Sequence, residues 1–163
     1  MFNQFTRSFD LPAPVKKILR PLVAWAAMAV LAVANGVFRE LAIIPRIGEY
    51  PGHVVSTALL VAAILAVAYA YFARTPDAYT VRELAAIGLG WMVMTVGFEF
   101  LVGYAEGTPV SVTLGQYDAL AGQVWILVPV TLVAAPLLFG RSRGRDAGEG
   151  RRRRRSGSEV NGR

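Results

Sequence analysis

Four titratable side chains, Arg39, Glu40, His53 and Glu99, lie inside or at the ends of strongly apolar stretches of the chain. An ionisable group at membrane depth costs several kcal/mol unless it is paired or wetted, so such groups are candidate functional residues. A carboxylate such as Glu99 can bind a cation or exchange a proton, and His53 can act beside it as an acid or base. Because no nucleophile motif accompanies them, we expect a protein that is not an enzyme.

Helical spacing predicts which of these groups face one another. Asn35 and Arg39 are four residues apart and share one helical face, as do Thr95 and Glu99. We therefore predict an ion pair between Arg39 and Glu99, with hydrogen bonds from Asn35, Thr95 and His53 completing an intramembrane polar cluster.

Several interpretations of this cluster stay open. Glu40 can pair with His53 or with Arg46 at the rim, and a buried Arg–Glu pair can serve only to fix helix register. Arg39 can instead extend to the lipid headgroups. The functional alternatives are a small oligomeric transporter or channel that uses Glu99 as its titrating or cation-binding group, and a membrane enzyme at the outer face. Glu40, His53 and Glu99 show no metal-ligand spacing, so we expect neither metal nor cofactor.

The elements that must position these residues are membrane helices. The 163 residues are 55% hydrophobic and contain no cysteine, which excludes thiol redox chemistry and disulfides. Four apolar blocks approach the length that crosses about 30 Å of hydrocarbon. They predict an all-α, polytopic four-helix transmembrane bundle over residues 21–140, with spans at 21–44, 54–73, 84–102 and 120–139.

The distribution of cations predicts the orientation. Cytoplasmic flanks of membrane helices collect Lys and Arg. Residues 1–20 and the connection at 74–83 carry cations, and the tail 141–163 holds nine arginines, whereas the connection at 103–119 has none. The chain is therefore expected in the cell (inner or plasma) membrane, with both termini in the cytoplasm. This orientation brings the polar cluster into one layer in the outer third of the bundle.

The two ends are expected to lie outside the bundle. Phe2, Phe5 and Phe9 predict a short interfacial helix within residues 1–20. The tail cannot build a core and is expected to be disordered. We expect it to contact anionic lipids rather than nucleic acid, through five consecutive arginines: Arg151, Arg152, Arg153, Arg154 and Arg155. A homo-oligomer is possible, and a cleaved leader ending at Ala32-Val33-Ala34 is the less favoured alternative.

Local signals mark the connections between spans. Two prolines and two glycines in residues 44–52 predict a tight outer turn. Thr80 and Glu83 predict a capping box for the third helix. Residues 108–117 alternate apolar and polar side chains, which fits a strand-like or an interfacial segment.

Glycine and proline residues within the spans predict where helices approach closely and where they bend. Gly88 and Gly97 predict close helix approach in the third span, as small residues allow in membranes. Pro129 and Pro136 predict a kink in the fourth span.

Several short motifs, taken together, resemble small bacterial four-helix membrane proteins. They are Asn35-Gly36-x-x-Arg39-Glu40, His53-x-x-Ser56-Thr57, Phe98-Glu99-Phe100-x-x-Gly103, Tyr117-Asp118 and Gly122-x-x-Trp125. The resemblance covers most of residues 34–141. Because that family has no established activity, it implies only the fold and a membrane location, and it groups Arg39, Glu40, His53 and Glu99 in one pattern.

Overall fold

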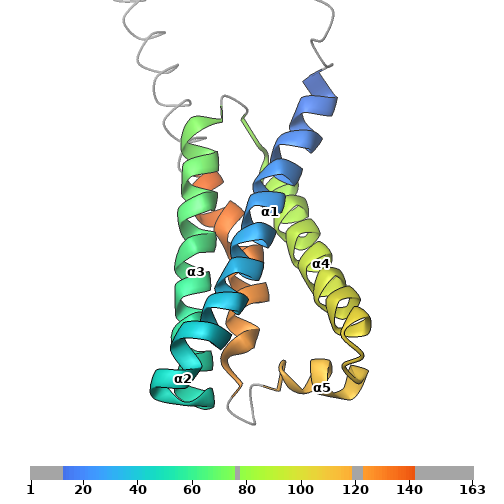
Figure 1. The fold of residues 1–163 in the computed structure, drawn as a ribbon. Coiled ribbons are helices and arrows are strands. Elements are labelled where there is room, and N and C mark those ends of the chain that lie inside the picture. The colour runs from blue at the N-terminus through green and yellow to red at the C-terminus, as the bar shows by residue number, and fades with distance from the viewer. Residues whose placement is uncertain (1–12, 76–77, 119–122, 142–163) are drawn as a thin grey trace, which may run out of the picture.

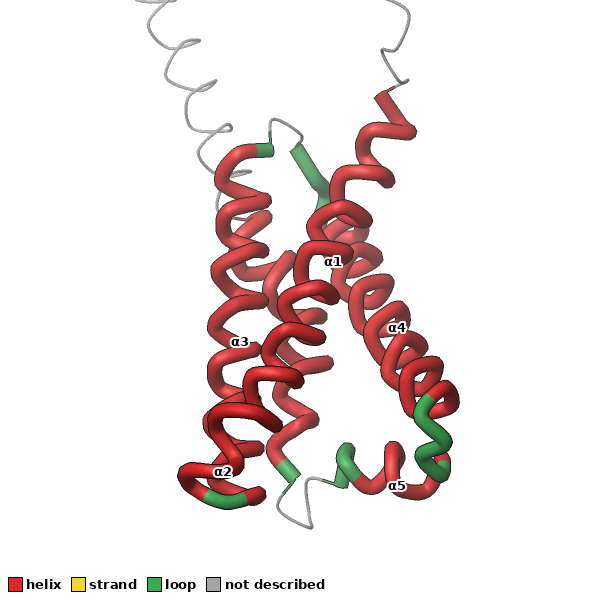
Figure 2. Tube along the Cα trace, viewed as in Figure 1, coloured by secondary structure: helices red, strands yellow, loops and turns green. Residues whose placement is uncertain are grey.

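The structure is a computed structural model that describes residues 13–75, 78–118 and 123–141. Its elements are α1 (Ala13–Phe38), the π-helical turn η2 (Arg39–Ile43), α2 (Ile44–Ile47), α3 (Glu49–Arg74), α4 (Val81–Ala105), α5 (Val110–Gly115) and the 3-10 turn η4 (Val124–Ile126). The turn η4 begins a last helix, Val124–Arg141, which we call the C-terminal helix (orange in Figure 1). Within the described ranges all regular structure is helical, as Figure 2 shows.

Four helices are long and apolar enough to cross a membrane: Lys17–Ile47, Glu49–Arg74, Val81–Ala105 and Val124–Arg141. This confirms the predicted all-helical architecture with four helices that could each cross a membrane. The helix α1 already begins at Ala13, so residues 13–20 belong to it rather than to a separate segment. In Figure 1, α1 and α4 run in one direction, while α3 and the C-terminal helix run in the other. As a result, α2 and α5 lie at the same end of the bundle.

The connections are more helical than the sequence pattern predicts. The tight turn predicted in residues 44–52 is present and is confined to Gly48, because helix continues on both sides of it. This glycine has a φ of +86°, a backbone conformation that costs a residue without a side chain little, and the chain reverses there. The segment left open at 108–117 contains the short helix α5. The predicted capping box of Thr80 and Glu83 is confirmed at the start of α4.

The buried core lies where α1, α3, α4 and the C-terminal helix meet. Its larger buried side chains are Met28, Leu60, Ile64, Phe72, Leu84, Trp91, Val128 and Leu132. The close helix approach predicted at Gly88 is confirmed, because an added Cβ would lie 2.7 Å from the carbonyl oxygen of Val133. At Gly97 the same prediction is wrong, since nothing lies within 4 Å of such a Cβ. The C-terminal helix continues through Pro136 to Arg141.

The parallel helices α1 and α4 are held together over only part of their length. Their ties are the Lys17 Nζ–Glu83 Oε1 ion pair at 3.1 Å and hydrogen bonds from Trp91 Nε1 to Pro21 O at 2.9 Å and from Trp25 Nε1 to Thr95 Oγ1 at 3.0 Å. Past this last tie the two helices diverge, and α5 lies across the open end (Figure 1). The fold therefore has a closed half and a wedge-shaped half.

Candidate functional site

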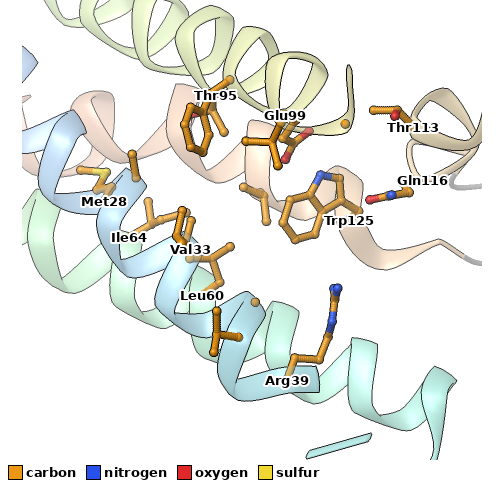
Figure 3. Close-up of a pocket in the computed structure, with 18 of the residues that line it drawn as sticks. Met28, Val33, Arg39, Leu60, Ile64, Thr95, Glu99, Thr113, Gln116 and Trp125 are labelled. Carbon is orange, nitrogen blue, oxygen red and sulfur yellow. The ribbon is translucent and has the colours of Figure 1, made fainter. Parts of the chain in front are cut away.

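The wedge between α1 and α4 contains a cavity of about 690 Å³. Side chains from α3, α5 and the C-terminal helix complete its walls, and Figure 3 shows many of them. The volume falls in the range of about 300–1,000 Å³ that is usual for small-molecule sites. The charged and amide side chains that line it are Arg39, Glu40, Glu99, Glu106 and Gln116.

The lining changes character along the cavity. Around Trp25 and Met28 the walls are apolar, with Ile64 and Leu132 contributed by α3 and the C-terminal helix. From Trp25 on α1 to Arg39 at the start of η2 the helix rises by about 21 Å, at about 1.5 Å per residue. The cavity is therefore elongated, with an apolar end toward the middle of the bundle and a polar end near α2 and α5.

Arg39 makes its ion pair within its own helix. Its Nη2 lies 2.9 Å from Glu40 Oε1, its Nε donates to the same oxygen at 3.1 Å, and its Nη1 lies 3.4 Å from His53 Nδ1. The predicted Arg39–Glu99 ion pair is therefore wrong. The physical reason is the divergence of α1 from α4, which places Glu99 on the opposite wall of the cavity (Figure 3). Glu40, the next residue in the chain, gives Arg39 a carboxylate partner on its own side of the cavity.

A π-helical turn positions Arg39 and Glu40. The turn η2 begins at Arg39, and the backbone N–H of Ile44 donates to the carbonyl of Arg39, five residues back. Pro45 follows and has no N–H, so the ordinary helical bond to the carbonyl of Leu41 cannot form. Single π-turns in helices are frequent at functional sites. Pro45 was the one sequence signal that could have indicated this turn.

Glu99 has a neutral hydrogen-bond partner. The hydroxyl of Tyr117, in the segment after α5, donates to Glu99 Oε2. Burial, and then the bond to Glu99, raise the pKa of the Tyr117 hydroxyl, which therefore stays protonated and remains a donor. The indole of Trp125 faces the same carboxylate (Figure 3), with its N–H outside hydrogen-bond geometry. In the part of the chain that the structure describes, no cation pairs with Glu99.

The remaining predicted residues have other partners. Asn35 Nδ2 donates to the Ser56 carbonyl on α3 at 3.1 Å, and Thr95 accepts the hydrogen bond from Trp25. His53 stacks obliquely near Trp125, with ring centroids 6.1 Å apart. The cavity is lined by Arg39, Glu40, Thr95 and Glu99, but Arg39 and Glu40 contact neither of the other two. Asn35 and His53 lie outside its lining and link α1 to α3.

The structure also bears on the predicted Glu40–Arg46 pair and on metal binding. Arg46 donates to the carbonyl of Ala42 and does not pair with Glu40. Among the described residues, no three His, Asp or Glu side chains are grouped so that they could hold a metal ion. The tail residues Arg151–Arg155 and the aromatic residues Phe2, Phe5 and Phe9 lie outside the described residues.

Sequence reasoning missed three groups that shape the site. The partner of Glu99 is Tyr117, which the sequence marks only as part of a motif. Trp25 and Gln116 also line the cavity. Tyr117 and Gln116 follow α5, whose fold across the bundle no local pattern indicates.

Comparison of the chain with protein-family models, with curated proteins and with solved structures found no match. The resemblance to small bacterial four-helix membrane proteins therefore stays a prediction from the motifs.

Proposed function

We propose that this chain is a multi-pass membrane protein that binds an amphipathic molecule in the cavity between α1 and α4. The observation that carries the proposal is the change in lining along one cavity, from Trp25 and Met28 at one end to Arg39 and Glu106 at the other. A bound amphiphile would bury its apolar part against the first pair and present its polar head to the second. Neither a fully apolar nor a fully polar ligand would match both ends.

The orientation inferred from the charges fits such a ligand. Lys and Arg collect on cytoplasmic flanks, so we place both termini in the cytoplasm and the α2–α5 end at the outer face of a cell membrane. In this orientation the polar end of the cavity lies near the outer headgroups and the apolar end near the bilayer centre. That is the orientation of a lipid in the outer leaflet. Contact of the arginine tail with anionic lipids and assembly into a homo-oligomer belong to the same proposal.

Binding suits the polar lining better than catalysis does. The single histidine of the chain, His53, lies outside the cavity lining, so no described acid–base pair with Glu99 faces a ligand. A transporter is the second candidate, and the observation that favours it is that Glu99 has no cationic partner among the described residues. Transport would require the cavity to open to both sides of the membrane.

Photoaffinity labelling tests the proposal directly. The full-length chain in phosphatidylcholine nanodiscs would be irradiated with alkyl amphiphiles that carry a diazirine in the chain, with either a charged or an uncharged head. We expect saturable labels on cavity residues such as Met28, Ala29 and Val102. Labels found only on residues outside the lining, such as Val30 and Leu59, would mean simple contact with bulk lipid and would overturn the proposal.

A matched pair of variants separates cavity binding from partition into the bilayer. Ala29 lines the cavity, whereas Ala26, one turn away on α1, is exposed and does not. Ala29→Phe should fill part of the cavity and abolish the saturable labelling. Ala26→Phe adds the same side chain toward lipid and should leave the labelling unchanged.

A further inference from the structure

We infer that the bound amphiphile carries an ammonium head, recognised by the Glu99 carboxylate and the Trp125 indole. This inference rests on the proposed function and specifies its ligand. It concerns Glu99 and its neighbours, about one helical turn beyond the Trp25–Thr95 contact.

The first step is the charge of the lining. Three carboxylates, those of Glu40, Glu99 and Glu106, face the cavity with one guanidinium, that of Arg39. Glu40 already neutralises Arg39 at 2.9 Å. The charge left for a ligand is therefore negative, and it belongs to Glu99 and Glu106.

The second step is the state of Glu99. The Tyr117 hydroxyl that donates to its Oε2 is neutral, so this bond stabilises the carboxylate without neutralising its charge. A charge at this depth is costly without a counter-charge. No described residue supplies that counter-charge, since Arg39, on the opposite wall of the cavity, is engaged by its neighbour Glu40. A cationic ligand head would supply it.

The third step is the aromatic neighbour. The ring of Trp125 lines the cavity beside Glu99, and its nitrogen edge is the part nearest the Glu99 carboxylate (Figure 3). Tryptophan attracts cations through its electron-rich ring, and aromatic residues are a common means of recognising quaternary ammonium groups. A carboxylate and an indole together favour an ammonium over a hydroxyl-bearing head and disfavour a phosphate or carboxylate head.

The test measures head-group preference at constant tail length. Radiolabelled dodecyltrimethylammonium and dodecyl glucoside would be titrated into the full-length chain in phosphatidylcholine nanodiscs, with empty nanodiscs subtracted. We expect the cation to bind about tenfold more tightly than the glucoside. Glu99→Gln should remove that preference by weakening cation binding about tenfold while leaving glucoside binding unchanged. Glu49→Gln, on an exposed residue outside the lining, is the matched control and should change neither.

The outcomes separate this inference from the proposed function. Saturable binding of both probes with equal affinity, unaffected by Glu99→Gln, would overturn the ammonium inference and leave the proposed function standing. Absence of saturable binding of either probe would overturn the proposed function itself. If Glu99→Gln does not fold, Glu99→Asp keeps the charge and should keep the cation preference. Loss of that preference in a folded Glu99→Asp protein would count against the inference.

The source of the ammonium is resolved by competition. Octadecylamine built into the nanodisc bilayer displaces the labelled cation if the natural ligand is a membrane lipid that enters sideways. Displacement only by dodecyltrimethylammonium added from water indicates a soluble amphiphile. Either result supports the ammonium head, and displacement by octadecanol to the same extent would contradict it.

Discussion

At the scale of single residues, the chemistry of the site depends on which polar groups satisfy one another. Arg39 is paired with Glu40, Asn35 with the backbone of α3, and Thr95 with Trp25. Each of these contacts holds a wall of the cavity. Glu99 differs because its partner Tyr117 is uncharged, so Glu99, like Glu106, has no cationic partner among the described residues.

A first prediction concerns Tyr117. Its raised pKa means that the folded protein holds the hydroxyl proton more tightly than the unfolded chain, in which tyrosine titrates near a pKa of about 10. The stabilising effect is therefore present below about pH 10 and is lost as pH rises through the folded value. In a spectrophotometric titration of the six tyrosines, Tyr117→Phe should remove the latest-titrating part of the curve.

The unfolded chain provides the control for this titration. In strong denaturant the hydroxyl loses its buried environment, and wild type and variant should differ only in total amplitude. A Tyr117→Phe curve that lost amplitude evenly over the whole pH range in the folded protein would contradict the burial of this hydroxyl.

At the scale of elements, the cavity results from the way α4 is attached. Its first half is tied to α1 by Lys17–Glu83 and Trp91–Pro21, and crosses the C-terminal helix closely at Gly88. Its second half leaves α1 and is supported by α5, where Thr113 packs beside Gly103. The wedge is thus fixed by the close crossing of α4 and the C-terminal helix at one end and by the packing of α5 against α4 at the other.

A second prediction tests this crossing. Gly88→Ala places a methyl group 2.7 Å from the Val133 carbonyl oxygen, so one backbone must shift. We expect the free energy of unfolding to fall by about 1–3 kcal/mol, measured by denaturation in detergent micelles. Gly90→Ala is the matched control two residues away: its Cβ would meet nothing within 4 Å. For Gly90→Ala the free energy of unfolding should instead rise by about 0.5–1 kcal/mol, because alanine favours the helix over glycine. Equal effects of the two substitutions would refute the close crossing.

At the scale of the whole molecule, the arrangement of the four long helices places α2, α5 and the polar end of the cavity at one end (Figure 1). The proposed orientation, which rests on the charge asymmetry, puts that end at the outer face of the membrane. In that orientation a water-soluble ligand would reach the polar end of the cavity from outside the cell.

A third prediction tests this orientation. The chain has no cysteine, so single cysteines report their own positions. Ser111→Cys on α5 and Ala78→Cys before α4 are exposed sites at opposite ends of the bundle. A membrane-impermeant maleimide should label Ser111→Cys in intact cells and Ala78→Cys only after permeabilisation. The reverse pattern would place both termini outside and overturn the assigned orientation.

The sequence by itself determined the four apolar helices and the capping box at Thr80 and Glu83. These follow from composition, local hydrogen bonding and helix length, which depend on residues close together in the chain. The partner choices were decided by tertiary structure alone. Arg39 pairs with Glu40 and Glu99 with Tyr117 because α4 diverges from α1 after the Trp25–Thr95 contact. Helix spacing fixes which face a side chain takes, but only the packing of distant helices fixes how far apart two faces stand.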